Sequence, residues 1–177
     1  MKRRTLIFFL FVLLSLPAAA QRMAVKTNLL YLATGTPDLG AELVVGERIS
    51  LSFSVFGSRN PYWRDKSLGE ETVTRFIALQ PEVRYWFNGR PLTRFYAGVN
   101  LLASAYDYPF RERVYQGNAA GAGLTVGYVF NLTRKLDLEL STGAGLLLYR
   151  GKREEEFTNG YKLCPQKLGV TLVYIIK

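Results

Sequence analysis

The chain has 177 residues, of which 49% are hydrophobic, and its 23 lysines and arginines outnumber its 14 acidic residues. It contains no histidine, which removes the usual general base, the serine-histidine hydrolase sites and the commonest metal ligand. Cys164 is the single cysteine, so no internal disulfide can form. We therefore expect no enzymatic activity, no metal site and no cofactor.

The first 20 residues have the pattern of a secretory signal peptide. Three basic residues precede an apolar run from Leu6 to Leu16, and three alanines at 18–20 form a small-residue cleavage site. We expect residues 1–20 to be removed and residues 21–177 to form a single β-barrel domain. Removal lowers the formal charge of +9 by three units, which leaves a modest basic excess, and we expect no nucleic-acid partner.

Beyond residue 20, apolar and polar residues alternate with a period of two, and no helical period is present. The alternation predicts eight strands, at about 24–33, 39–45, 49–56, 72–87, 95–103, 122–130, 136–148 and 168–176. The predicted connections are short at 46–48, 88–92 and 131–134, long at 58–71, 106–116 and 149–163, and tight at 34–37. This layout is typical of an all-β, eight-stranded antiparallel up-and-down transmembrane β-barrel of the outer membrane.

The two faces of the predicted strands differ in chemistry. The polar face is built mainly from small residues, which suit the narrow interior of an eight-stranded barrel: Gly40, Ser52, Gly98, Asn100, Gly127, Ser141 and Gly143. The leucines would then face lipid. Aromatic residues at the strand ends predict two interfacial girdles, one from Tyr85, Phe87, Phe95, Tyr128, Phe130 and Tyr174, the other from Tyr31, Tyr106, Tyr108 and Tyr149. The alternative is a soluble exported lipocalin-like binding barrel with its leucines inside.

The fourth predicted strand carries Glu82 and Arg84 on its inward face and Pro81 on its outward face, where a proline fits a bulge. The same count places further charges inside, so that the predicted lumen cluster is Lys26, Glu42, Glu82, Arg84, Asp137 and Glu139. Buried charges without partners cost several kcal/mol, so these should form salt bridges that fill the lumen. Acid-base catalysis by Glu82 with Asp137 or Glu139 is the alternative interpretation.

Basic residues gather in the predicted long loops. They are candidates for contacts with lipopolysaccharide phosphates or a protein partner, but a solvated loop surface is the interpretation that the sequence favours. They are Arg59, Arg64, Lys66, Arg111, Arg113, Arg150, Lys152 and Arg153.

Three segments, KTNLLY at 26–31, TPDLGAE at 36–42 and PEVRYWF at 81–87, resemble the hallmark segments of an exported family of Bacteroidota, domain of unknown function 3575. The resemblance spans the chain after residue 20. It implies a small outer-membrane barrel, often encoded near fimbrillin-type pilus or surface-assembly genes, and no established activity or catalytic residues.

We therefore expect a non-enzymatic outer-membrane barrel with a filled lumen and a structural or surface-interaction role, accessory to fimbria or surface assembly. Its expected partners are outer-membrane lipid, lipopolysaccharide and a surface or fimbrial protein. A transport barrel for small apolar molecules and the soluble lipocalin-like barrel are the alternatives.

Overall fold

The computed structural model describes residues 22–60, 74–110, 113–153 and 156–176. The predicted signal peptide and the basic residues Arg64, Lys66 and Arg111 lie outside the described residues. The strands are β1 (Met23–Asn28), β2 (Asp38–Val44), β3 (Ile49–Asn60), β4 (Thr74–Trp86), β5 (Arg94–Phe110), β6 (Arg113–Asn131), β7 (Leu136–Arg153) and β8 (Glu156–Ile175). A short helix, α2 (Leu29–Ala33), connects β1 to β2.

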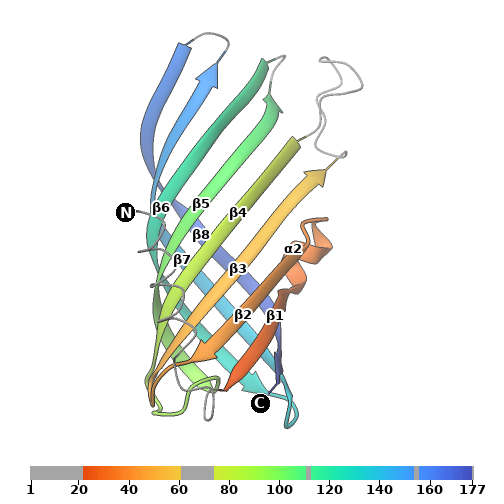
Figure 1. Cartoon of the computed structure of the whole chain (residues 1–177), viewed down its shortest axis with the longest axis vertical. Coiled ribbons are helices and arrows are strands. Elements are labelled where there is room, and N and C mark those ends of the chain that lie inside the picture. Colours follow the sequence, from red (N-terminus) through yellow and green to blue (C-terminus); the bar gives the residue numbers. More distant parts are fainter. Residues whose placement is uncertain (1–21, 61–73, 111–112, 154–155, 177) are drawn as a thin grey trace, which may run out of the picture.

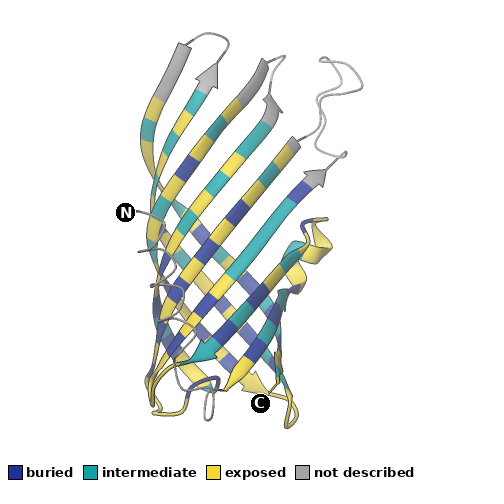
Figure 2. Ribbon diagram, in the orientation of Figure 1, coloured by how far each residue is buried: buried dark blue, intermediate teal, exposed yellow. Residues whose placement is uncertain are grey.

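Each strand pairs antiparallel with its neighbours in the chain, and β1 also pairs with β8, so the sheet closes into a ring. Buried and exposed residues alternate along the strands (Figure 2). Leu51 and Phe53 are exposed on the outer face of β3, whereas the alternating Ser50 and Ser52 are buried. The predicted all-β fold of eight antiparallel strands and the predicted inward direction of the polar face are confirmed.

The aromatic residues next to the short turns lie on the outer face, as predicted. They are Tyr85, Phe87, Phe95, Tyr128, Phe130 and Tyr174.

The prediction of a second outer girdle is wrong for three tyrosines, because their side chains belong to the inner face. Tyr31 packs on the inward Phe56, with 5.0 Å between ring centroids. The cross-strand register places Tyr106 and Tyr149 on the same face of the sheet as Ala119, which is buried. The side chain of Tyr108 lies outside the described residues.

Four strands extend far beyond their predicted ends. β5, β6, β7 and β8 contain 17, 19, 18 and 20 residues. The predicted loops at 106–116 and 149–163 are therefore wrong, since their described residues continue the two hairpins. The prediction that basic residues lie in loops is also wrong for those that fall in strands, namely Arg59, Arg113, Arg150, Lys152 and Arg153. Continued pairing with a neighbouring strand outweighs the loop-like composition of these segments.

The first strand is shorter than predicted because Asn28 ends it and starts α2. The Asn28 side chain accepts a hydrogen bond from the Leu30 amide at 3.1 Å, which is the bond of a helix N-cap. The same side chain donates to the Leu168 carbonyl of β8 at 3.1 Å. The wall of the ring is consequently low at β1, α2 and β2, while β4 to β8 rise above it (Figure 1).

The predicted bulge at Pro81 is wrong. The register of β4 against β5 is unchanged across this residue, because Leu79 pairs with Ala103 and Glu82 with Asn100.

The irregularity lies instead between β7 and β8. Gly143 pairs with Lys167 and Ala144 with Pro165, so Gln166 is the extra residue. Proline cannot donate a ladder hydrogen bond, and a bulge beside it removes that demand. As a result, Gln166 and Lys167 both direct their side chains into the ring, where they contact other inward residues.

Candidate functional site

Arg84 of β4 faces three carboxylates in the interior of the ring, and its side chain is 1% exposed. It donates to Glu82 Oε2 at 2.9 and 3.0 Å, to Glu42 Oε2 at 2.8 Å, and to both oxygens of Glu139 at 2.9 and 3.0 Å. Its guanidinium also lies 4.3 Å from the centre of the Tyr96 ring. Because the acceptors belong to β4, β2 and β7, one side chain connects three parts of the ring.

Two lysines complete this network. Lys26 of β1 forms ion pairs with Glu42 and with Glu139, the latter at 2.6 Å. Lys167 of β8 forms an ion pair with Glu82. Together with Arg84, three cations face three carboxylates, and the cluster is formally neutral. Attraction between buried charges offsets their desolvation only when the geometry is good and further hydrogen bonds are made.

Those further hydrogen bonds are present. Tyr96 of β5 donates to Glu139 Oε1 at 2.6 Å, and Ser50 of β3 donates to Glu42 Oε1 at 2.5 Å. Trp86 then donates from its indole nitrogen to the Ser50 hydroxyl at 2.8 Å. The carboxylates are thereby fixed from the neighbouring strands as well as from the cations.

A small apolar layer lies between the charges and the short turns. Its members, each at most 3% exposed, are Ala24, Trp86, Leu92, Tyr96, Val129 and Val173. Leu92 belongs to the turn between β4 and β5 and has a φ of 63°, a left-handed conformation that is uncommon for leucine. This conformation accompanies a side chain that is buried in the layer rather than exposed in the turn. The charges and the apolar layer together fill the interior near the short turns.

The structure brings together five of the six residues predicted for the lumen cluster. Lys26, Glu42, Glu82, Arg84 and Glu139 are all in contact.

Asp137 is the exception. It is buried, but it forms no ion pair among the described residues and lies two positions nearer the short turn than Glu139. Lys167 takes the sixth place in the cluster. Sequence reasoning missed it because the predicted strand began at Leu168, although a basic residue that continues the alternation of an apolar strand could have signalled it.

Other kinds of site find no support within the described ranges. No three or more acidic or cysteine side chains there are grouped so that they could hold a metal ion. Likewise, no helix among these residues is long and apolar enough to span a membrane.

The family model described as a protein of unknown function, DUF3575, matches residues 6–176. The chain belongs to this family. The match includes every strand of the ring and all three segments on which the resemblance rests, so the DUF3575 family extends over the whole sheet. Comparisons with curated proteins and with solved structures return no match. The function of this DUF3575 chain must therefore be argued from its geometry.

Proposed function

We propose that this DUF3575 chain is a non-enzymatic outer-membrane β-barrel that is sealed by the Arg84 ion-pair network and has a structural or surface-interaction role. The observation that carries the proposal is the exposed apolar surface on the outside of the ring. Soluble monomers rarely expose a contiguous apolar patch larger than a few hundred Å². A soluble lipocalin-like barrel would have the opposite arrangement, with leucines inside.

The height of this surface fits a bilayer. On β7 the outward apolar residues run from Leu138 to Leu148, with only small side chains at Thr142 and Ala144 between the leucines. This segment is about 33 Å long at about 3.3 Å per residue, or roughly 23 Å along the ring axis at a tilt of about 45°. Membrane barrels carry an apolar band about 25 Å tall.

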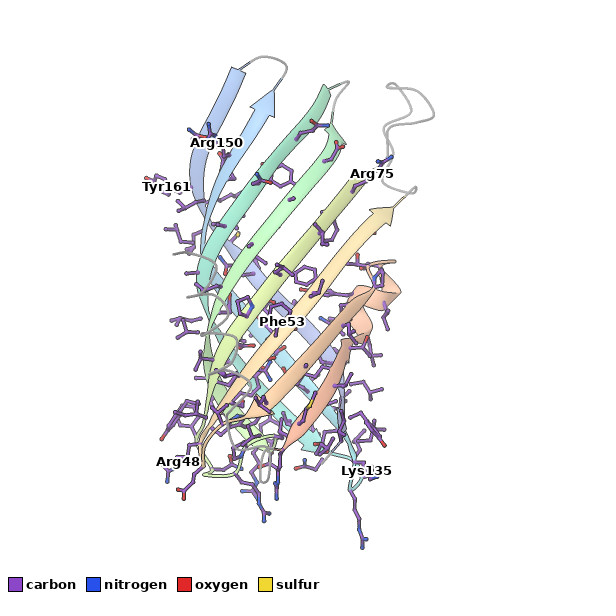
Figure 3. The ribbon with its side chains drawn as sticks, viewed as in Figure 1. Arg48, Phe53, Arg75, Lys135, Arg150 and Tyr161 are labelled. Atoms are coloured by element: carbon purple, nitrogen blue, oxygen red, sulfur yellow. The ribbon has the colours of Figure 1, made fainter. Side chains whose placement is uncertain are left out.

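Both borders of the surface are marked. The border near the short turns is the aromatic row described above, in which Phe87 and Phe95 have ring centroids 5.5 Å apart. At the other border, cross-strand neighbours form a polar belt on the outer face: Arg75, Asp107, Gln116, Asn118, Arg150 and Asn159. Figure 3 places Arg75 and Arg150 toward the tall end of the ring and Arg48 and Lys135 at the short-turn end. In an outer membrane, lipopolysaccharide phosphates would lie near the two guanidinium groups of this belt, and arginine binds phosphate well.

The filled interior supports a structural role for the inward charges. A general acid or base must approach its substrate within hydrogen-bond distance. The Glu82 and Glu139 side chains are 1% exposed and are both held by Arg84. This arrangement favours a plug over an acid-base pair, and it equally disfavours transport of a small molecule straight through the ring.

Membrane location is tested by fractionation combined with gel mobility. We expect the protein in the outer-membrane fraction, released only by detergent, and we expect unheated samples to migrate differently from boiled ones because a closed sheet has no free edge from which to unravel. A soluble periplasmic marker from the same cells is the control. Recovery of the chain in the soluble periplasm without a heat-dependent shift would exclude the membrane barrel.

The surface-interaction role concerns the hairpins β5–β6 and β7–β8, whose strand pairing continues past the polar belt. These hairpins form the tall end of the ring (Figure 1). We expect variants with Asn-Gly turns in place of 108–115 and 152–157 to keep the heat-dependent shift, because such turns connect antiparallel strands. The same variants should lose the adducts that surface cross-linking of intact cells gives with the original chain. A matched variant altered at 132–135, in the opposite turn, should keep them. Unchanged adducts after both hairpins are shortened would remove this role.

A further inference from the structure

The interior of the ring has two sections. They meet at Gln80 and Gln166, which lie on opposite sides of the ring. The Gln80 side-chain amide donates to the Gln166 backbone carbonyl at 3.2 Å. Most inward side chains on the short-turn side of this level are buried, including the ion-pair network and the apolar layer. Beyond this level, in the outer section, the inward side chains are mostly half-buried: Phe56, Phe76, Leu102, Ser104, Tyr106, Leu147 and Tyr149. Because these side chains point into the ring, solvent reaches the interior there.

The large side chains of the outer section lie along its wall. A Cβ atom added to Gly117 would be 2.8 Å from the Tyr106 hydroxyl, and one added to Gly160 would be 2.6 Å from Cζ of Tyr149. Each tyrosine therefore extends over a glycine of the next strand. These two rings therefore lie along the wall of the section and do not point toward its middle. An eight-stranded ring is wide enough either for packed side chains or for one small ligand.

The outer section also holds a basic side chain. Lys162 of β8 pairs in register with Leu147, so its side chain is on the inner face, and no ion pair to it forms among the described residues. The carboxylate of Asp38, near α2, accepts hydrogen bonds from the Asn28 backbone amide at 2.7 Å and from the Thr27 hydroxyl at 3.1 Å. The Lys162 ammonium group can attract an anionic group locally.

The low part of the wall gives an apolar route from the side. β8 pairs with β1 only from Thr171 to Ile175, and among the described residues α2 is the next element above that pairing. The leucines of α2 are exposed: Leu29, Leu30 and Leu32. Tyr161, farther along β8, points away from the ring (Figure 3). An amphiphile in the outer leaflet would meet apolar side chains on both sides of this route.

We propose that the outer section binds a single-chain anionic amphiphile of the long-chain carboxylate class. Its carboxylate lies near Lys162, and its alkyl chain lies against Phe56, Phe76 and Leu102. One chain is specified because the ring is narrow, and a membrane amphiphile because the low wall faces the apolar surface. This binding site is additional to the structural role and does not require passage through the ion-pair network.

The test uses palmitate that carries a diazirine on its chain, photolysed with the full-length protein in phosphatidylcholine nanodiscs. Adducts are expected on inward residues such as Phe76 and Leu102. Ser104→Trp fills the outer section and should lower the adduct yield about tenfold, whereas Ala105→Trp, the outward neighbour on β5, should change it less than about twofold. A fold check by gel mobility accompanies each variant.

Lys162→Gln tests the charge without adding volume. It should lower labelling by the palmitate probe about fivefold and leave labelling by the matching diazirine hexadecanol unchanged, while Lys135→Gln at the short-turn end alters neither. Adducts confined to outward residues such as Leu101 would overturn the site, as would an equal loss in Ala105→Trp. An equal effect of Lys162→Gln on acid and alcohol would overturn the carboxylate assignment.

Discussion

Replacing Arg84 with methionine is expected to lower the free energy of unfolding by about 3–5 kcal/mol, the range found when one partner of a buried ion pair is removed. Three carboxylates would then share the two lysines of the network. Methionine retains much of the arginine stem, so lost packing contributes little. The measurement is a urea titration of the detergent-refolded protein, followed by fluorescence of Trp86, which is fully buried beside the cluster.

A charge-balanced double variant separates electrostatics from volume. Arg84→Met with Glu139→Gln leaves two cations and two carboxylates, so it should be more stable than Arg84→Met alone. The coupling energy from the full cycle should be between about 0.5 and 3 kcal/mol. Arg90→Met, in the exposed turn after β4, should stay within about 0.5 kcal/mol of the original chain. If Arg84→Met also stays in that range, the network does not hold the ring together.

The part of the site that sequence could predict is the part that follows strict alternation. Glu82 and Arg84 are two residues apart on one strand, and the same parity holds for Lys26, Glu42 and Glu139 on theirs. Two-residue spacing fixes the face of a side chain whatever the neighbouring strands do. Their pairing then follows from the cost of isolated buried charges.

Gln166 could not be placed in this way, because the bulge beside Pro165 breaks the alternation there, whereas Lys167 keeps the alternation with Thr171 and was missed because the predicted strand began at Leu168. Three prolines occur in strands, Pro81, Pro109 and Pro165, and composition alone does not say which one requires a bulge. Pro81 keeps a regular register because the ladder between β4 and β5 has no pairs at Gln80 and Pro81. No β5 residue therefore needs a hydrogen bond from the amide hydrogen that proline lacks.

The lengths of β5 to β8 were also beyond sequence reasoning. Segments such as 106–116 contain several charges and a proline, which together are typical of loops. They are strands because each lies against a partner that is equally long, as in the pairing of Tyr106 with Gly117. The misplaced loops also hid the direction of Tyr106 and Tyr149, and with it the open outer section of the ring.

Placing an arginine at Leu124 is the second change for which we expect a large effect. Leu124 lies on the outer face of β6, midway between the aromatic row and the polar belt, and is 68% exposed. In a membrane barrel an arginine at the bilayer midplane costs about 2–4 kcal/mol, whereas near the interfaces it costs about 0–1 kcal/mol. We therefore expect Leu124→Arg to be less stable than Leu124→Ala by about 2–4 kcal/mol in phosphatidylcholine vesicles.

Gln116→Arg is the matched control, since it lies on the same strand and face but in the polar belt, opposite Asp107. It should cost no more than about 1 kcal/mol relative to Gln116→Ala. The comparison is decisive because a soluble protein would show a different change in stability at Leu124. Exposed leucine replaced by arginine in water usually changes stability by less than about 0.5 kcal/mol. Equal, small effects at Leu124 and Gln116 would mean that the apolar surface faces water or another protein, and the membrane barrel would have to be abandoned.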